Sequence, residues 1–198
     1  MIDVSMSLDG FIAGPHDGRE LPLGGRGGEH VFDWYFGGER PYRGTMFKPK
    51  GPNRRVVAEM FRRSGAMLTG RRTYEIAGGW GGTHPVDGIP VVIMTHRPPA
   101  DPPTGRSRLV FVTDGIESAV ARAKELAKGK DVGIGGASVA QQALRAGLVD
   151  ELHLHVAPIL LGDGVRLFEH LGTEAVRLRF VGSVESGDAV HLRYEVVR

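Results

Sequence analysis

Two short stretches of the sequence combine glycine and hydroxyl residues in a way that suits a phosphate group. The stretch DVGIGGASVAQQAL (131–144) reads as an apolar strand, a glycine turn and a helix. Gly135 and Gly136 let the backbone approach a ligand closely, and Ser138 is placed to cap the helix, whose free N–H groups and positive dipole end face the turn. A phosphate is stabilised at such a helix start, but a tight turn without a ligand explains this stretch alone equally well.

The stretch MLTGRRTYE has the same design and adds charge. A strand ends just before Gly70, which allows the turn, and Thr73 can hydrogen-bond at the start of the next helix. Arg71 and Arg72 place two fixed positive charges there, which suits a pyrophosphate or a phosphomonoester. A solvated basic turn is the alternative.

The stretch VVIMTHRPP brings Thr95, His96 and Arg97 to the end of a third strand. Ligands of open α/β sheets bind at the carboxyl edge of the strands, so three such strand ends predict an extended ligand lying across that edge. A dinucleotide has the right length, and Arg97 or Arg71 is suited to select a 2′-phosphate.

The glycine turn does not match the Rossmann fingerprint, in which G-x-G-x-x-G follows the first strand. Gly133 and Gly135 fit, but Ser138 takes the third position, and Asp150 and Glu151 precede a strand where an acid should end one. No Lys-Ser or Lys-Thr pair follows the turn, so a P-loop is excluded as well.

The elements that must position these turns alternate along the chain. Strands are expected at 2–7, 66–69, 91–95, 109–112, 132–135, 151–158, 178–185 and 189–197. Helices are expected at 54–64 and at 115–128, where Asp114 is placed to cap and Gly129 to terminate the helix. The pattern predicts an α/β fold in one domain, 1–198: a mixed, mostly parallel sheet of about eight strands, helices on both faces and a C-terminal hairpin.

Composition narrows the setting and the partners. The chain has 25 Lys and Arg against 23 Asp and Glu, a net charge of +2, which gives nucleic-acid binding no support. It has no cysteine, which excludes disulfides and thiolate metal sites. No apolar run approaches the ~18 residues that span a membrane, and residues 1–13 do not resemble a signal peptide. We therefore expect a cytoplasmic protein that binds neither nucleic acid nor a membrane.

Taken together, the motifs resemble a known family. The order of the motifs, followed by a closing hairpin, resembles that of proteins with the dihydrofolate-reductase-like fold. The motifs are, in order, VSMSLDGFIAG, MLTGRRTYE, PVVIMTHRP, VGIGGASVAQQAL and VDELHLHVAPILLGDGVRLF. The resemblance covers nearly the whole chain. It is nearer to stand-alone relatives of the C-terminal reductase domain of the bifunctional riboflavin-biosynthesis deaminase–reductase. That enzyme reduces the opened ribose of 5-amino-6-(5-phosphoribosylamino)uracil.

The resemblance implies NADPH as the hydride donor and assigns residues to its parts. By resemblance, the pyrophosphate and adenosine side of the cofactor contacts Gly70, Arg71, Arg72 and Thr73, and its 2′-phosphate contacts Thr95, His96 and Arg97. The phosphates lie against the turn formed by Gly135, Gly136, Ala137, Ser138 and Val139. The nicotinamide lies against Ser5, Ile12 and Ala13.

Departures from the riboflavin enzyme leave the substrate open. Ala77 stands where that enzyme has an aspartate, residues 15–28 do not match its substrate segment, and the zinc deaminase half has no counterpart. The sequence predicts an NADPH-dependent reductase of a pyrimidine or pteridine heterocycle. A true dihydrofolate reductase and an NADP-binding protein without catalysis are the alternatives.

Two carboxylates are the candidates for the catalytic acid. Asp33, with Glu29, lies in GEHVFDWYF, a short helix expected beside the cleft, where dihydrofolate reductases carry a carboxylate that anchors the pterin; a surface acid is the alternative. By resemblance Asp9 lies near the active site, although capping of the DG turn explains it as well. Trp34, Trp80 and Tyr35 either stack on a heterocycle or pack in the core.

The strand ELHLHVAPILL carries two histidines on one face. A metal site at His153 and His155 needs a third ligand, for which His170 and His191 are available, but we expect pairing with polar neighbours or an oligomer interface and no metal. The resemblance and the apolar strand predict a homodimer, because exposed strand edges are usually covered.

Overall fold

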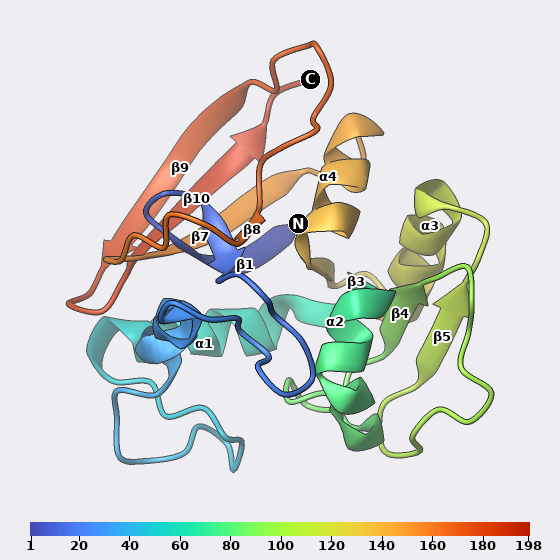
Figure 1. Ribbon diagram of the computed structural model, residues 1–198, viewed down its shortest axis with the longest axis horizontal. Coiled ribbons are helices and arrows are strands. Elements are labelled where there is room, and N and C mark those ends of the chain that lie inside the picture. The colour runs from blue at the N-terminus through green and yellow to red at the C-terminus, as the bar shows by residue number, and fades with distance from the viewer.

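The computed structural model describes all 198 residues and is built on an eight-stranded sheet with helices on both faces (Figure 1). In spatial order the strands are β5 (Leu109–Val112), β4 (Val91–Met94), β3 (Ser64–Gly70), β6 (Asp131–Gly135), β1 (Ile2–Ser7), β7 (Glu151–Ala157), β10 (Val190–Val196) and β9 (Leu178–Glu185). Neighbours from β5 to β7 pair in parallel, and β10 is antiparallel to β7 and β9. The predicted mixed, mostly parallel sheet is confirmed.

Helices and short connecting elements complete the fold. They are α1 (Gly51–Arg63), α2 (Arg71–Ile76), α3 (Ile116–Ala127) and α4 (Ala137–Arg145), with the 3₁₀ helices η1 (Gly28–Tyr35) and η2 (Gly78–Gly82). A separate pair of short strands, β2 (Phe11–Ala13) and β8 (Val165–Arg166), was not predicted. No helix has the length and apolar character needed to cross a membrane.

The two faces of the sheet differ in chemistry, and the alternation along β1 shows it. Ile2 and Val4 belong to the main apolar core, which α3 and α4 close from one side. Asp3 and Ser5 point to the opposite face because successive side chains of a strand alternate. There η1 and α1 cover the sheet with Trp34 and other buried aromatic and aliphatic side chains. One face is therefore an apolar core, and the other holds buried polar groups.

Both predicted helix caps were wrong. The N-cap of α3 is Gly115 (φ 105°) and that of α4 is Gly136 (φ 92°), and neither helix start has a side-chain cap hydrogen bond. Asp114 therefore lies one residue too early, and Ser138 is already inside α4, where its Oγ accepts from Gln142 Nε2 at 3.2 Å. A glycine with positive φ makes each turn, and it leaves the helix N–H groups open.

The strand from which we predicted a homodimer, β7, is not at an edge of the sheet. β7 lies between β1 and β10, so both of its edges are paired, and our reason for a dimer through this strand was wrong. The edge strand at this end is β9, in the hairpin at upper left in Figure 1. Its Leu178, Phe180 and Val181 are exposed.

Candidate functional site

The main cleft of the protein, about 1070 Å³, opens where β3, β4 and β6 end and α2 and α4 begin. Strand register brings these ends together, since Gly70 lies opposite Met94 and Thr69 opposite Gly135. Every residue assigned to the cofactor by resemblance lines this cleft: Ser5, Ile12, Ala13, Gly70, Arg71, Arg72, Thr73, Thr95, His96, Arg97, Gly135, Gly136, Ala137, Ser138 and Val139. Residues far apart in sequence thus form one continuous surface.

The glycine turn before α4 has the geometry of a phosphate cradle. The first backbone hydrogen bond of the helix runs from Ala140 N–H to Gly136 C=O at 3.1 Å, so the N–H groups of the preceding residues have no partner within the helix. A Cβ on Gly136 would lie 2.7 Å from Thr73 Oγ1, so the turn packs directly against the start of α2. Open N–H groups and the helix dipole make this corner suitable for an anion.

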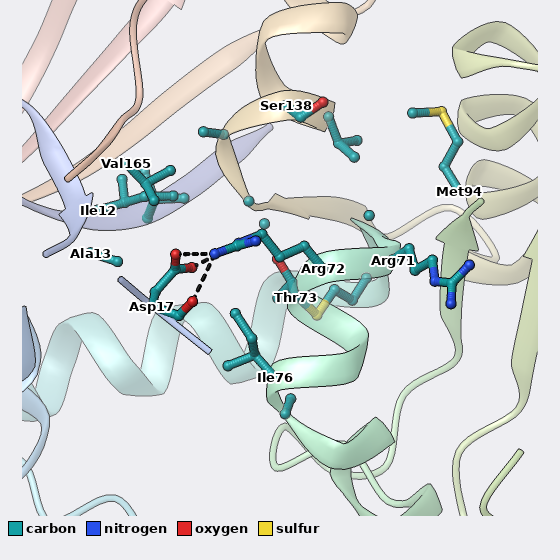
Figure 2. A pocket seen from close by; sticks show the side chains of 18 of the residues that line it. Ile12, Ala13, Asp17, Arg71, Arg72, Thr73, Ile76, Met94, Ser138 and Val165 are labelled. Carbon is teal, nitrogen blue, oxygen red and sulfur yellow. Dashed lines mark hydrogen bonds and ion pairs between the residues drawn. The ribbon is translucent and has the colours of Figure 1, made fainter. Parts of the chain in front are cut away.

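The three arginines of the cleft differ in their partners. Arg71 donates from Nε to Glu75 Oε1 at 2.6 Å, one turn along α2. Arg72 is ion-paired with Asp17 of the glycine-rich loop, which Figure 2 shows between α2 and the side of the cleft formed by Ile12 and Val165. Arg97 has no ion-pair partner, and of the three it is the one whose charge is fully available to a ligand.

The other part of the cleft is less charged. Its floor includes Asp3 and Ser5 of β1, and Ser5 Oγ accepts from Trp34 Nε1 at 2.9 Å. Its walls are aromatic and aliphatic side chains from η1, α2 and η2: Phe32, Tyr35, Ile76, Ala77 and Trp80. Trp80 and the part of Tyr35 that lines the cleft are thus available to a heterocycle, whereas Trp34 is fully buried and stacked on Tyr35 with ring centroids 3.7 Å apart.

His84 supplies a neutral donor to the same part of the cleft. Burial lowers the pKa of His84 to about 4, although the hydrogen bond from Val86 N–H acts in the opposite direction. Because Nδ1 accepts that N–H at 3.3 Å, the imidazole proton is on Nε2.

Neither carboxylate chosen as a catalytic candidate lines the cleft. Asp33 accepts from His30 Nδ1 at 2.9 Å with its side chain 62% exposed. Asp9 accepts from Ser7 Oγ at 2.6 Å and from the backbone N–H groups of Leu161 and Gly162, so it holds the DG turn against the loop after β7.

The pKa of Asp9 indicates that its carboxylate only accepts hydrogen bonds and does not act as an acid. Burial acts to raise it, but the hydrogen bonds from Ser7, Gly162 and Leu161 outweigh burial and lower the pKa to about 2. At neutral pH Asp9 therefore has no proton to give.

Sequence reasoning missed Asp3. It lines the cleft floor and accepts from His155 Nε2 at 3.0 Å, while His155 Nδ1 lies 2.8 Å from His191 Nδ1. The expectation that His155 pairs with polar neighbours is confirmed. The signal that could have found Asp3 is the alternation Asp3, Ser5, Ser7 on an otherwise apolar strand. No group of three His, Cys, Asp or Glu residues is arranged to hold a metal ion.

The mostly parallel eight-stranded sheet, its closing hairpin and the long cleft at the carboxyl edge of its strands define an α/β protein with the dihydrofolate-reductase-like fold. The chain belongs to the RibD C-terminal domain family, which matches residues 1–192. The resemblance drawn from the motifs is thereby confirmed.

Solved structures agree on the fold. A protein assigned to riboflavin biosynthesis from Shewanella sp. PV-4 is 22% identical, with a TM-score of 0.70 over 100% of this chain and 98% of that one. The diaminohydroxyphosphoribosylaminopyrimidine deaminase/5-amino-6-(5-phosphoribosylamino)uracil reductase of Thermotoga maritima is 13% identical, with a TM-score of 0.60 over 99% of this chain and 56% of that one. Dihydrofolate reductase from Enterococcus faecalis, solved with NADP(H), is 16% identical, with a TM-score of 0.50 over 76% of this chain and 85% of that one.

Proposed function

We propose that the protein is an NADPH-dependent reductase of a pyrimidine or pteridine heterocycle. One observation supports this most strongly. A single cleft holds two sets of groups. One set suits phosphates: the open N-terminus of α4, the turn into α2 and the unpaired Arg97. The other set suits a heterocycle: Asp3 on the floor and the aromatic side chains of the walls. A phosphorylated dinucleotide and a flat heterocycle can therefore share this cleft.

The donor set fits the cofactor. Backbone N–H groups of Ala137 and Ser138 and the side chain of Thr73 suit a pyrophosphate, and Arg97 suits a 2′-phosphate. Ile12 and Ala13 offer an apolar wall to the nicotinamide. When bound, NADPH supplies a hydride; the residues of this chain bind it, orient it and exclude water.

The substrate class rests on the cleft walls. Phe32, Tyr35 and Trp80 offer faces on which a flat ring stacks, and Asp3 and His84 offer an acceptor and a donor to its polar edge. The activity named for the Thermotoga enzyme makes 5-amino-6-(5-phosphoribosylamino)uracil the first substrate to test. Ala77 lines the cleft at the position where the resemblance to the riboflavin enzyme implies an aspartate, so 7,8-dihydrofolate is tested as a second substrate.

Two measurements test the proposal. Quenching of intrinsic fluorescence measures binding of NADPH, and loss of absorbance at 340 nm measures its oxidation with each of the two substrates. We expect tight binding and turnover of one substrate. Binding without turnover of either would favour an NADP-binding protein without catalysis, and absence of binding would overturn the proposal. A homodimer and a cytoplasmic location remain predictions.

A further inference from the structure

A buried polar chain lies behind the floor of the cleft. It runs from Asp3 of β1 to His155 of β7, on to His191 of β10 and to Asn53 of α1, with consecutive distances of 3.0, 2.8 and 2.9 Å. The indole of Trp34 packs against both imidazoles, with ring centroids 4.5 and 4.7 Å away. Asp3 lines the cleft, and the other members of the chain lie behind it.

The hydrogen bonds fix where the protons of this chain are. Asn53 Nδ2 faces the carbonyl oxygen of Trp34 at 3.1 Å and Asp188 Oδ2 at 3.5 Å, so Nδ2 donates and Oδ1 accepts. His191 Nε2 must then donate to Asn53 Oδ1. Burial, with the charge of His155, lowers the pKa of His191 to about 4, so at neutral pH His191 carries no second proton. Its Nδ1 is therefore an acceptor.

This assignment leaves an extra proton on the next pair. His155 Nδ1 must donate to His191 Nδ1, which uses the single proton of a neutral imidazole. His155 Nε2 nevertheless lies 3.0 Å from Asp3 Oδ1, a distance that requires a proton between the two atoms. Asp3 and His155, called here the buried Asp–His pair, therefore hold one proton more than a carboxylate and a neutral imidazole do.

Other titratable groups of the cleft are poor proton sources. The arginines keep their protons at any working pH, and Asp17 is engaged by Arg72. His84 is neutral at pH 7. Burial raises the pKa of Tyr35 well above its usual range, and its hydroxyl is directed to Met60. His96 follows β4 and is next to Arg97, in the part of the cleft proposed for the 2′-phosphate and not for the heterocycle.

We propose that Asp3, backed by His155, delivers the proton that accompanies reduction in this cleft. The inference rests on the proposed reductase function. Reduction of a C=N or C=O bond requires a hydride at carbon, which NADPH supplies as it becomes NADP⁺, and a proton at nitrogen or oxygen. That proton passes from His155 Nε2 to the Asp3 carboxylate and from Asp3 to the substrate, which leaves the pair one proton short.

A second histidine and a partly exposed carboxylate lie near the pair on the side away from the cleft. His153 Nδ1 lies 3.8 Å from Asp3 Oδ2, and His153 Nε2 lies 2.9 Å from Glu151 Oε2. The Glu151 side chain is 22% exposed, at the edge of this polar layer. This is the side from which solvent protons approach Asp3 without passing through the cleft, and the 3.8 Å between His153 and Asp3 is longer than a hydrogen bond, so the transfer requires His153 to move closer.

The groups that face the pair keep Asp3 ionised, so that the extra proton of the pair is on His155. Burial raises the pKa of Asp3, but the hydrogen bond and charge of His155, with the charges of His153 and the amino group of Met1, outweigh burial and lower it. His191 and Tyr35 face the pair from β10 and η1. Because the reaction consumes the proton that the pair holds, kcat should be lower at a pH high enough to remove that proton.

Variants of the pair test the proposal in the full-length protein. Asp3→Asn keeps the shape of the side chain but cannot pass a proton, so kcat should fall about 100-fold or more while NADPH affinity stays unchanged. Asp3→Glu should restore part of kcat, and His155→Gln should remove the fall of kcat at high pH. Asp101→Asn, an exposed aspartate away from the cleft, controls for loss of charge. Thermal melting shows that each variant folds.

Imidazole NMR of histidine-labelled protein gives a second readout that needs no substrate. At pH 7 we expect a downfield proton at His155 Nε2 in the wild type and its loss in Asp3→Asn. If His155 Nε2 carries no proton in the wild type, the buried Asp–His pair does not hold the extra proton. If Asp3→Asn matches the wild type in kcat and pH profile, Asp3 is not the proton donor, although the pair can still hold the extra proton. A wild type that binds NADPH but reduces neither substrate overturns the proposed function itself, and the donor role with it.

Discussion

Arg72 donates from Nε to Asp17 Oδ2 at 3.1 Å, and this pair ties the start of α2 to the glycine-rich loop on the other side of the cleft (Figure 2). An arginine that suits a phosphate is therefore already engaged by a carboxylate. A bound anion has to share Arg72 with Asp17 or displace it.

The first prediction concerns this competition. Asp17→Asn removes the competing charge, so NADPH should bind more tightly, by up to about fivefold, the scale of an exposed ion pair. Fluorescence titration at two salt concentrations measures the effect, which should shrink at high salt. Glu20→Gln, in the same loop and without a partner, is the matched control. Weaker binding by Asp17→Asn would mean that Asp17 helps to hold the cofactor.

The second prediction concerns cofactor choice. Arg97 is the cleft arginine without an ion-pair partner, so Arg97→Gln should cost NADPH about 1.5–3 kcal/mol and leave NADH unaffected. Titration of both cofactors gives the ratio directly. Arg108→Gln, an exposed arginine outside the cleft, should leave the ratio as it is. Equal affinities of the wild type for NADPH and NADH would rule out a 2′-phosphate contact.

The third prediction tests the cradle at α4. Ser138→Asp puts a carboxylate at the helix start, where it favours the helix by about 0.3–1 kcal/mol but repels a phosphate. NADPH binding should weaken roughly tenfold or more without a drop in melting temperature. Ser138→Asn keeps the size without the charge and serves as the control. Substitution of Gly136 is a poorer test, because φ is 92° and a Cβ would strike Thr73.

The fourth prediction concerns Asp33, the catalytic acid predicted from the sequence. Asp33 is exposed and pairs with His30 outside the cleft. We therefore expect Asp33→Asn to keep full turnover and only to lower the pKa of His30, which the hydrogen bond and charge of Asp33 now raise. A fall in kcat of about 100-fold would instead return Asp33 to the role of acid or anchor.

The fifth prediction concerns assembly. We expect a dimer to form through β9, because of the two edge strands, β5 and β9, only β9 carries exposed large apolar side chains. Light scattering should give a dimer for the wild type and a monomer for Phe180→Lys, which puts a charge on the exposed apolar edge. A wild-type monomer at micromolar concentration would remove the homodimer from consideration.

The turns before α2 and α4 could be predicted because each one is formed by consecutive residues. Gly70 with its two arginines, and Gly135 with Gly136, are consecutive residues at the end of an apolar strand, so their geometry follows from a few neighbours. The prediction of the two helix caps was wrong, although each cap is local as well. Gly115 and Gly136 fit the turns without a side-chain cap, and a hydroxyl or carboxyl residue nearby was a misleading signal.

The polar layer behind the cleft could not be predicted, because its members come from four separate elements. Asp3, Asn53, His155 and His191 meet only through the register of β1, β7 and β10 and the packing of α1. Each of them, read alone, looks like an ordinary polar residue. Asp33 shows the converse, since its sequence context is suggestive but its position in η1 turns it to solvent.

The central position of β1 also has a consequence for how the protein is made. Ile2 lies opposite Ile134 and Leu152, so β1 is synthesised before both strands that it pairs with and has no sheet partner until residues 131–157 have followed it. Contacts between residues so far apart form slowly, and an unpaired apolar strand is prone to aggregate meanwhile. The strand that carries Asp3 and Ser5 is thus synthesised before its sheet partners and enters the sheet late, so yield during expression should depend on chaperones and on slow growth at low temperature.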